Sequence, residues 1–236
     1  MKAIVLAAGR GERLRPLTDA CPKPLLKVRG KALIEWHLEA LARGGVRQVV
    51  INTAWLEEQI VDALGDGSRF GLQIAYSMEG RDHGGALETA GGLKQALPLL
   101  TGKGDAETGF WYVAADVFAP EFEFDPSAVE AFRRSHELAR LWMVPNPPQH
   151  PLGDFGLAAG RVVPGAEGER FTWSGIGLFR AAFVHELMPT LPPGAKARLR
   201  PYLDAAMAQG RLGATAYAGP WADVGTPERL AALQTG

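Results

Sequence analysis

Apolar positions in the first 144 residues follow two alternating patterns. Short continuous apolar runs are typical of buried strands, whereas longer segments with apolar residues three or four positions apart are typical of amphipathic helices. The predicted strands cover residues 2–6, 47–52, 72–76, 109–114 and 139–144, and the predicted helices cover residues 32–42, 56–64, 88–99 and 127–134. Strands and helices that alternate at this spacing indicate βαβ units, right-handed crossovers and a mostly parallel sheet.

The pattern changes beyond residue 145. Prolines recur through residues 145–151 and predict a rigid loop, because proline restricts its own φ angle. Short strand-like runs follow and predict an antiparallel, lid-like section. The strands are expected at residues 155–158, 161–163, 171–179 and 214–217, and the helices at residues 181–188, 201–209 and 227–233. No internal repeat occurs, so we expect one domain, residues 1–236, with a first portion at 1–144 and a second at 145–236.

Composition narrows the class of protein without naming it. The hydrophobic share of 47% and the charged share of 22% are those of an ordinary soluble globular protein. Lys and Arg number 25 against 26 Asp and Glu, for a net charge of −1, so no overall field draws the protein to nucleic acid or to an acidic membrane. Any binding of anions must therefore be local.

Cysteine usage and hydropathy indicate a compartment. The single cysteine, Cys21, excludes an internal disulfide and a metal site built from several thiolates. The apolar run at residues 3–8 is shorter than the core of a signal peptide, and Arg10 and Arg13 follow it. No stretch approaches the roughly 20 apolar residues that a membrane span needs. We therefore expect a cytoplasmic protein that contacts neither membrane nor nucleic acid.

The segment after the first strand is a candidate phosphate-binding loop. Gly9 and Gly11 allow the backbone to turn sharply and to bring its N–H groups close to an anion. Cations are also concentrated there, and so much positive charge is costly unless an anion or solvent offsets it. These cations are Arg10, Arg13, Arg15 and Lys23.

Two common nucleotide motifs do not fit this loop. The dinucleotide pattern GxGxxG fails because Leu14 stands at the third glycine position, and no Walker pattern GxxxxGK[ST] occurs. Residues 6–18 instead match LAAGxGxRLxPLT, and residues 22–26 read PKPLL. In these two segments the chain resembles the sugar-1-phosphate nucleotidyltransferases.

Within that family the resemblance is strongest to the uridylyltransferases that act on N-acetylmuramate 1-phosphate in cell-wall recycling. It extends over most of the chain, through segments at residues 52–56, 65–72, 87–92, 171–176 and 221–226. The resemblance implies the nucleotide-diphospho-sugar transferase fold, an α/β fold with a Rossmann-like mixed, mostly parallel sheet flanked by helices and a small antiparallel lid section. It also implies a nucleotide-binding first portion and a second portion that binds the sugar and supplies a second metal ligand.

The activity implied by the resemblance is transfer of a nucleotidyl group from an NTP, UTP in the first instance, to a sugar 1-phosphate, with release of pyrophosphate. The partners would be these two small-molecule substrates, and the cofactor would be Mg²⁺. Two alternatives stay open. One is glucose 1-phosphate or mannose 1-phosphate as the acceptor, and the other is a non-catalytic sensor of nucleotide sugars on the same fold.

Two aspartates are the candidate metal ligands. Asp116 ends an apolar strand, where a carboxylate is costly to bury unless it is paired or bound to a metal. Asp223 precedes the last predicted helix, but Thr226 is better placed to cap that helix because Pro227 follows it. Mg²⁺ commonly takes one or two carboxylates together with phosphate oxygens.

The remaining site residues are carried over from the resemblance. Arg13 and the loop amides would hold the phosphates that leave, and Lys23 would offset charge on the reacting phosphates, which makes Arg13 and Lys23 the catalytic candidates. The nucleotide-binding residues would be Leu6, Ala7, Ala8, Gly9, Gly11, Glu12, Arg13, Glu79 and Glu88. The sugar would contact Asn146, Asp154, Ser174 and Gly175.

Two departures from the family pattern are visible. Ala114-Ala115 precede Asp116 where relatives usually have Asn-Gly, so an amide that could contact the sugar is missing. Residues 80–86 form a longer segment with three glycines, for which we expect a flexible flap. The sequence alone leaves the base, the sugar and the oligomeric state open.

Overall fold

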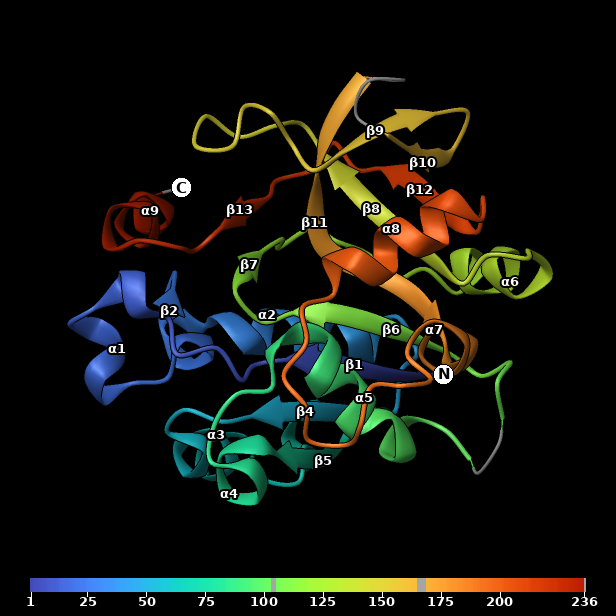
Figure 1. The fold of residues 1–236 in the computed structure, drawn as a ribbon. Helices are drawn as coiled ribbons and strands as arrows, with labels where there is room; N and C mark the ends of the chain where they lie inside the picture. Colours follow the sequence, from blue (N-terminus) through green and yellow to red (C-terminus); the bar gives the residue numbers. More distant parts are fainter. Residues whose placement is uncertain (103–104, 165–168, 236) are drawn as a thin grey trace.

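The computed structural model of the chain describes residues 1–102, 105–164 and 169–235. Its centre is a nine-stranded sheet in the order β5-β4-β1-β6-β11-β8-β12-β10-β9 (Figure 1). The strands of this sheet are β1 (Lys2–Leu6), β4 (Gln48–Thr53), β5 (Gln73–Met78), β6 (Gly109–Ala114), β8 (Ala139–Val144), β9 (Phe155–Ala158), β10 (Arg161–Val163), β11 (Glu169–Arg180) and β12 (Leu212–Ala216).

The sheet is parallel over its first four strands and mixed beyond them. β5, β4, β1 and β6 run parallel, with Leu6 opposite both Asn52 and Ala114. β11 then lies antiparallel between β6 and β8, and β12 pairs with β8 in parallel. The segment at 171–179, predicted to belong to the lid-like section, is therefore a central strand of the main sheet. The start of β11 also pairs antiparallel with β9, and β9 pairs antiparallel with β10, so these strands form the expected antiparallel section.

Helices cover both faces of the sheet, as Figure 1 shows. Buried side chains of α5, α7 and α8 pack in one apolar cluster, and those of α2, α3 and α6 pack in a second cluster on the other face. These helices are α2 (Leu33–Arg43), α3 (Glu57–Leu64), α5 (Glu88–Leu100), α6 (Pro126–Arg134), α7 (Ala181–Leu187) and α8 (Arg200–Ala208). All of them were predicted, with bounds that differ by one residue at most at either end.

Short elements that the sequence pattern did not predict lie around the loops. The hairpin of β2 (Lys27–Val28) and β3 (Lys31–Ala32) follows the helix α1 (Leu17–Ala20). The helix α4 (Glu79–His83) includes residues 80–83 of the segment for which we expected a flexible flap. The segment is thus partly helical, and its flexibility stays a prediction. The first residue of α4, Glu79, is 1% exposed and forms buried hydrogen bonds, which anchor the helix.

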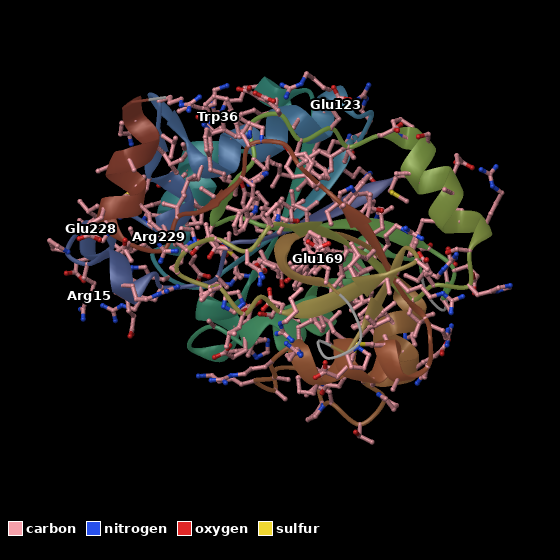
Figure 2. The ribbon with its side chains drawn as sticks, turned by 90° about the horizontal axis from the view of Figure 1, so that it is seen from above. Arg15, Trp36, Glu123, Glu169, Glu228 and Arg229 are labelled. Atoms are coloured by element: carbon pink, nitrogen blue, oxygen red, sulfur yellow. The ribbon has the colours of Figure 1, made fainter. Side chains whose placement is uncertain are left out.

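The end of the chain returns to its beginning. β13 (Ala222–Asp223) pairs antiparallel with β7 (Val117–Phe118), and the last helix, α9 (Pro227–Ala232), follows. As predicted, Thr226 caps this helix and accepts a hydrogen bond from the backbone of Arg229. Figure 2 shows Arg229 of α9 on the same side of the molecule as Arg15 of the first loop. Among the described residues, no helix has the length and apolarity to cross a bilayer.

Candidate active site

A cavity of about 580 Å³ lies at the carboxyl ends of β1, β4 and β6. Ligands in open α/β sheets bind at this edge because the loops that follow parallel strands meet there. The cavity is lined by Leu6, Ala7, Ala8, Gly9, Arg10, Gly11, Glu12, Arg13, Lys23, Pro24, Asn52, Ala86, Glu88, Thr89, Tyr112, Ala114, Ala115, Asp116 and Gly225. Every predicted nucleotide-binding residue except Glu79 is among them, together with Lys23 and Asp116.

The glycine loop is held in one shape by contacts within the first 26 residues. Gly11 has a φ of 69°, in the left-handed region that favours glycine. The Thr18 hydroxyl donates a hydrogen bond of 2.9 Å to the carbonyl of Gly11. A Cβ at Gly11 would lie 3.1 Å from side-chain carbons of both Thr18 and Lys23, so a larger residue would be crowded as well as strained.

Lys23 and Asp116 form an ion pair across the cavity. The Lys23 side chain is brought in by a 3-10 turn flanked by proline, and the whole residue is only 8% exposed. Its Nζ lies 2.7 Å from Oδ2 of Asp116, whose side chain remains 48% exposed. Desolvation acts to raise the pKa of Asp116, but the Lys23 charge and its hydrogen bond outweigh it and hold that pKa below its ordinary value. Asp116 is thus an ionised carboxylate that is partly exposed beside the Lys23 ammonium group.

Asp223 is brought beside Asp116 by the small β7–β13 ladder. Asp223 pairs with Val117, and the backbone N–H of Val224 donates a hydrogen bond of 2.9 Å to the carbonyl of Asp116. The Asp223 carboxylate is bonded on both oxygens: Arg229 binds Oδ2, and the Gln149 amide donates to Oδ1 at 2.6 Å. The fold thus brings the turn that holds Asp116 beside the strand that holds Asp223, although Asp223 is not among the residues that line the cavity.

These two carboxylates fit a hard divalent cation that is also bound by phosphate. Their oxygens are the ligands that Mg²⁺ prefers, and phosphate oxygens and water can complete its coordination. Among the residues described, no group of three or more His, Cys, Asp or Glu side chains forms a cage for a metal by itself. The role of Asp116 and Asp223 as metal ligands therefore stays a prediction.

A buried polar network supports the start of the loop from behind. Asn52, at the end of β4, accepts a 2.8 Å hydrogen bond from the backbone of Ala7 and donates one of 2.7 Å to Glu79 Oε1. Glu79 Oε2 accepts a 2.8 Å bond from the backbone of Leu87, just before α5. A Cβ at Gly92 of α5 would lie within 2.6 Å of this pair. The network therefore ties the loop after β1 to the beginning of α5.

Glu79 does not line the cavity, although we predicted it as a nucleotide contact. It is 1% exposed, and both of its carboxylate oxygens are bonded inside the protein. Burial raises the pKa of Glu79, with opposition from the bonds to Leu87 and Asn52. Glu88, by contrast, lines the cavity at the start of α5, where its φ is 60°.

The predicted sugar contacts Asn146 and Asp154 lie outside the cavity lining and are bonded within the protein. The Asn146 amide donates to the carbonyls of Pro151 and Arg170, and its oxygen accepts from Thr172. Asp154 accepts a 2.8 Å bond from the backbone of Trp173.

Ser174 and Gly175 lie on β11, beside the cavity wall. Ser174 is fully buried, and its hydroxyl accepts a hydrogen bond from the backbone of Ile176. A Cβ at Gly175 would lie 2.9 Å from Cβ of Ala114, which does line the cavity. These two residues are therefore closer to the site than Asn146 and Asp154, and all four stay predictions as sugar contacts.

Nine cavity residues were absent from the predicted set, and Arg10, Asn52 and Tyr112 are three of them. Arg10 belongs to the glycine loop that the sequence singled out, so its position in that loop could have identified it as a cavity residue. Asn52 stood at the end of a predicted strand. Tyr112 alternates with Ala114 on β6 and faces the same side of the sheet, but nothing in an apolar strand marked it as a cavity residue.

A second cavity, of about 800 Å³, opens at the opposite edge of the sheet. It is lined at the amino ends of the strands by residues that include Lys2, Gln48 and Gly109. Neither the glycine loop nor the two candidate metal ligands reach it. The smaller cavity therefore carries the candidate chemistry.

The architecture and the site together define a class of protein. The chain matches the family Nucleotidyl transferase over residues 2–163, and it belongs to that family. It is a nucleotidyltransferase with the nucleotide-diphospho-sugar transferase fold, which confirms the fold class and the family expected from the sequence.

Particular relatives make the similarity more specific. The chain is 47% identical to the N-acetylmuramate alpha-1-phosphate uridylyltransferase of Neisseria meningitidis serogroup B, over 99% of this chain and 97% of that protein. It is 33% identical to the protein of the same name from Caulobacter vibrioides, over 98% and 94%. A solved Bacillus anthracis structure, assigned as a glucose-1-phosphate thymidylyltransferase, superposes with a TM-score of 0.83 at 21% identity, over 99% of this chain and 94% of that one. At this identity, the similarity to the Bacillus anthracis structure shows the fold alone.

Proposed function

We propose that the protein transfers a uridylyl group from UTP to N-acetylmuramate 1-phosphate, with release of pyrophosphate, as a cytoplasmic step of peptidoglycan recycling. The observation that carries the proposal is the Lys23–Asp116 pair, 2.7 Å apart, beside a glycine loop at the carboxyl edge of the sheet. Similarity over 99% of the chain to a uridylyltransferase of that sugar phosphate supports the choice of substrates.

The reaction needs little from the protein in the way of acid–base chemistry. The second pKa of a phosphate monoester is near 6, so the sugar phosphate is mostly dianionic at neutral pH and is already a nucleophile. Its phosphate oxygen attacks the α-phosphorus of UTP, and the bond between that phosphorus and the bridging oxygen to the β-phosphate breaks. The pyrophosphate leaves with the electron pair of that bond. Catalysis then depends on alignment and on neutralisation of charge.

The residues of the cavity divide this work. Lys23 offsets negative charge on the attacking and attacked phosphates, while Arg13 and the loop amides bind the phosphates that leave. Asp116 and Asp223 would hold Mg²⁺, which neutralises phosphate charge and draws the reacting groups together. Ala8, in the loop after β1, and Glu88, at the start of α5, would face the nucleoside.

Ser174 and Gly175 support a sugar subsite on the β11 side of Ala114. Asn146 and Asp154 would then act by shaping the loop at residues 145–154, where their polar atoms are bonded to its backbone or to β11. The absence of a side-chain amide at Ala114 leaves more room beside the sugar.

Release of pyrophosphate tests the proposal. Folded protein, UTP and Mg²⁺ would be combined with N-acetylmuramate 1-phosphate, glucose 1-phosphate or mannose 1-phosphate, and the nucleotide sugar identified by mass spectrometry. Turnover with N-acetylmuramate 1-phosphate that exceeds turnover with the other two is expected. A preference for glucose 1-phosphate or mannose 1-phosphate would replace the proposed sugar, and no release with any acceptor would overturn the proposed activity.

The variant Asp223→Asn separates an enzyme from a nucleotide-sugar sensor. In an enzyme the variant should lose turnover by a larger factor than it loses affinity for UTP, because the carboxylate would hold the cation that neutralises charge on the reacting phosphates. In a sensor no turnover exists to be lost. Isothermal titration with UTP, run beside the pyrophosphate assay, measures both quantities.

A further inference from the structure

Arg10 lies in the glycine loop, between Gly9 and Gly11, and its guanidinium has no hydrogen-bond partner among the residues described. Its side chain is 35% exposed and lines the cavity. Among the residues that the structure describes, none of its five N–H donors makes a hydrogen bond. Its Nε is buried, and it is the one buried side-chain nitrogen or oxygen without a partner in that part of the chain. A buried donor of this kind costs stability unless a ligand satisfies it.

The neighbouring carboxylate does not account for Arg10. The distance from Nη2 of Arg10 to Oδ1 of Asp19 is 3.7 Å, which is too long for a hydrogen bond. The same oxygen of Asp19 accepts a 2.7 Å hydrogen bond from Nε of Arg15. The guanidinium of Arg10 is therefore attracted to Asp19 without being bound by it.

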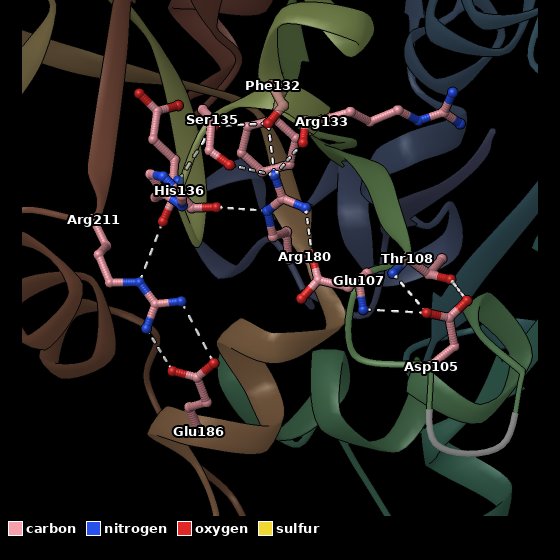
Figure 3. Close-up of polar contacts among 11 residues, drawn as sticks. Asp105, Glu107, Thr108, Phe132, Arg133, Ser135, His136, Arg180, Glu186 and Arg211 are labelled. Atoms are coloured by element: carbon pink, nitrogen blue, oxygen red, sulfur yellow. Dashed lines mark hydrogen bonds and ion pairs between the residues drawn. The ribbon is translucent and has the colours of Figure 1, made fainter.

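An arginine that serves the fold has different surroundings in the same molecule. Arg180, at the end of β11, is 6% exposed and donates to the carbonyls of Phe132, Arg133, Ser135 and Glu137 (Figure 3). It also pairs with the Glu107 carboxylate. The guanidinium of Arg180 is thus satisfied by the protein itself, whereas that of Arg10 is not.

Trp55 holds Arg10 in position by its ring face alone. The guanidinium carbon of Arg10 lies 4.0 Å from the centroid of the Trp55 ring, a favourable cation–π distance. Trp55 is itself tied to the loop, because its Nε1 donates a 2.8 Å hydrogen bond to the carbonyl of Thr18, whose hydroxyl bonds Gly11. Stacking uses none of the N–H donors, so the guanidinium is oriented and still available for an anion.

The position of Arg10 indicates which phosphate groups it can bind. Asp116 follows β6, whereas Trp55 follows β4, and these two strands flank β1 on opposite sides. Lys23 and Asp116 therefore mark the reacting phosphate on one side of the loop, and Arg10 lies toward the other. A planar guanidinium with free donors suits phosphate oxygens, which it can bind in pairs.

We propose that Arg10 binds the β- and γ-phosphates of the nucleoside triphosphate, and hence the pyrophosphate that leaves. This proposal rests on the proposed function for the direction in which the triphosphate lies. Arg10 is then a binding residue for the leaving group. Trp55 is a positioning residue that holds the guanidinium in place before the nucleotide arrives.

Isothermal titration with three probes tests this role: UTP, UMP and inorganic pyrophosphate, each with Mg²⁺. In Arg10→Gln the Kd for UTP and for pyrophosphate should rise about ten-fold or more, the equivalent of one lost charge-assisted hydrogen bond. The Kd for UMP should not change, because UMP has neither phosphate. Arg10→Lys should fall between wild type and Arg10→Gln, since it keeps the charge and loses the planar pair of donors.

Arg15→Gln is the matched control. It removes one positive charge from the same loop, but Arg15 bonds Asp19 and does not line the cavity. Its Kd for UTP should stay within about two-fold of wild type, because an exposed charge outside the site is screened by salt. Thermal unfolding provides the check on folding. Without ligand, Arg10→Gln should melt no lower than wild type, and its shift in Tm with UTP should be smaller.

Several outcomes would overturn the proposal. An equal loss for UTP in Arg10→Gln and Arg15→Gln would indicate general electrostatics, and an equal loss for UTP and UMP would place Arg10 on the nucleoside or α-phosphate. Unchanged UTP affinity in Arg10→Gln would also overturn it. The proposed activity fails separately: if Arg10→Gln weakens UTP and pyrophosphate but wild type transfers to no sugar phosphate, the phosphate site stands and the reaction does not.

Discussion

The ammonium group of Lys23 lies 2.7 Å from a carboxylate oxygen of Asp116, although the two residues are 93 positions apart in the chain. The pair joins the loop after β1 to the end of β6. Both residues line the cavity, so the pair places a positive charge there. A lysine that is 8% exposed and has one carboxylate partner is suited to receive a phosphate beside it.

Replacing Lys23 should abolish most of the turnover. In Lys23→Met we expect kcat for pyrophosphate release to fall by about 10²-fold or more, the loss typical of a single group that stabilises charge in a transition state. Lys31→Met is the control, because Lys31 also forms an ion pair, 2.6 Å from Glu39, but does not line the cavity. Equal turnover in the two variants would remove Lys23 from the role proposed for it.

The two loop glycines should respond differently to alanine. Gly11 has a φ of 69° and lies against Thr18 and Lys23, so Gly11→Ala should lower the free energy of unfolding by about 1–2 kcal/mol from the left-handed conformation alone. A Cβ on Gly9 would meet no atom within 4 Å, and the φ of Gly9 lies outside the left-handed region, so Gly9→Ala should leave stability nearly unchanged. Urea unfolding of both variants measures the difference, and equal losses would contradict it.

Glu79 should make the stability of the protein depend on pH. Burial raises its pKa in the folded state, so the folded protein retains a proton that the unfolded chain has already released. The contribution of Glu79 to stability is therefore present below the ordinary glutamate pKa and is lost as the pH rises through the raised folded-state value. Glu79→Gln removes this ionisation, and relative to it wild type should become less stable as the pH rises through that window.

Urea unfolding between about pH 4 and 8 tests the Glu79 prediction, because this range begins near the ordinary pKa of a glutamate and extends past neutral pH. Glu79→Gln also loses an acceptor for Asn52 or Leu87, which should cost about 1–3 kcal/mol at every pH, so the slope with pH is the informative quantity. Glu58→Gln, at an exposed position of α3, is the control and should follow wild type. Parallel curves for wild type and Glu79→Gln would refute the linkage.

Gln149 should compete with a cation for Asp223. Its amide donates a 2.6 Å hydrogen bond to Oδ1 of Asp223, and the other oxygen is bound by Arg229. Gln149→Ala frees Oδ1, so the apparent affinity for Mg²⁺ should rise by about two-fold to ten-fold, which corresponds to one ordinary hydrogen bond. Titration of Mg²⁺ in the pyrophosphate assay measures this apparent affinity. Gln48→Ala is the control, because it removes an amide that is bonded to Gln73 at the far end of the sheet. Weaker Mg²⁺ binding in Gln149→Ala would contradict the prediction.

The sequence predicted the helices and strands of the main sheet because their apolar spacing is local. Residues 109–114 and 139–144 were predicted with the bounds that the structure has. Local pattern could not place β11 between β6 and β8, since strand order depends on pairing between distant segments. It also missed α4, where three glycines favoured a flexible loop but the buried Glu79 anchors a helix.

For the site, the sequence by itself singled out the glycine loop and the two aspartates, because glycines, cations and a charge at the end of an apolar strand are visible in the order of residues. Only the tertiary structure decided how they are used. It pairs Lys23 with Asp116, encloses Glu79 behind the cavity, and stacks Arg10 on Trp55, where no described residue bonds its Nε. Hydrogen bonds and burial depend on which distant groups meet, and the sequence of a loop does not contain that information.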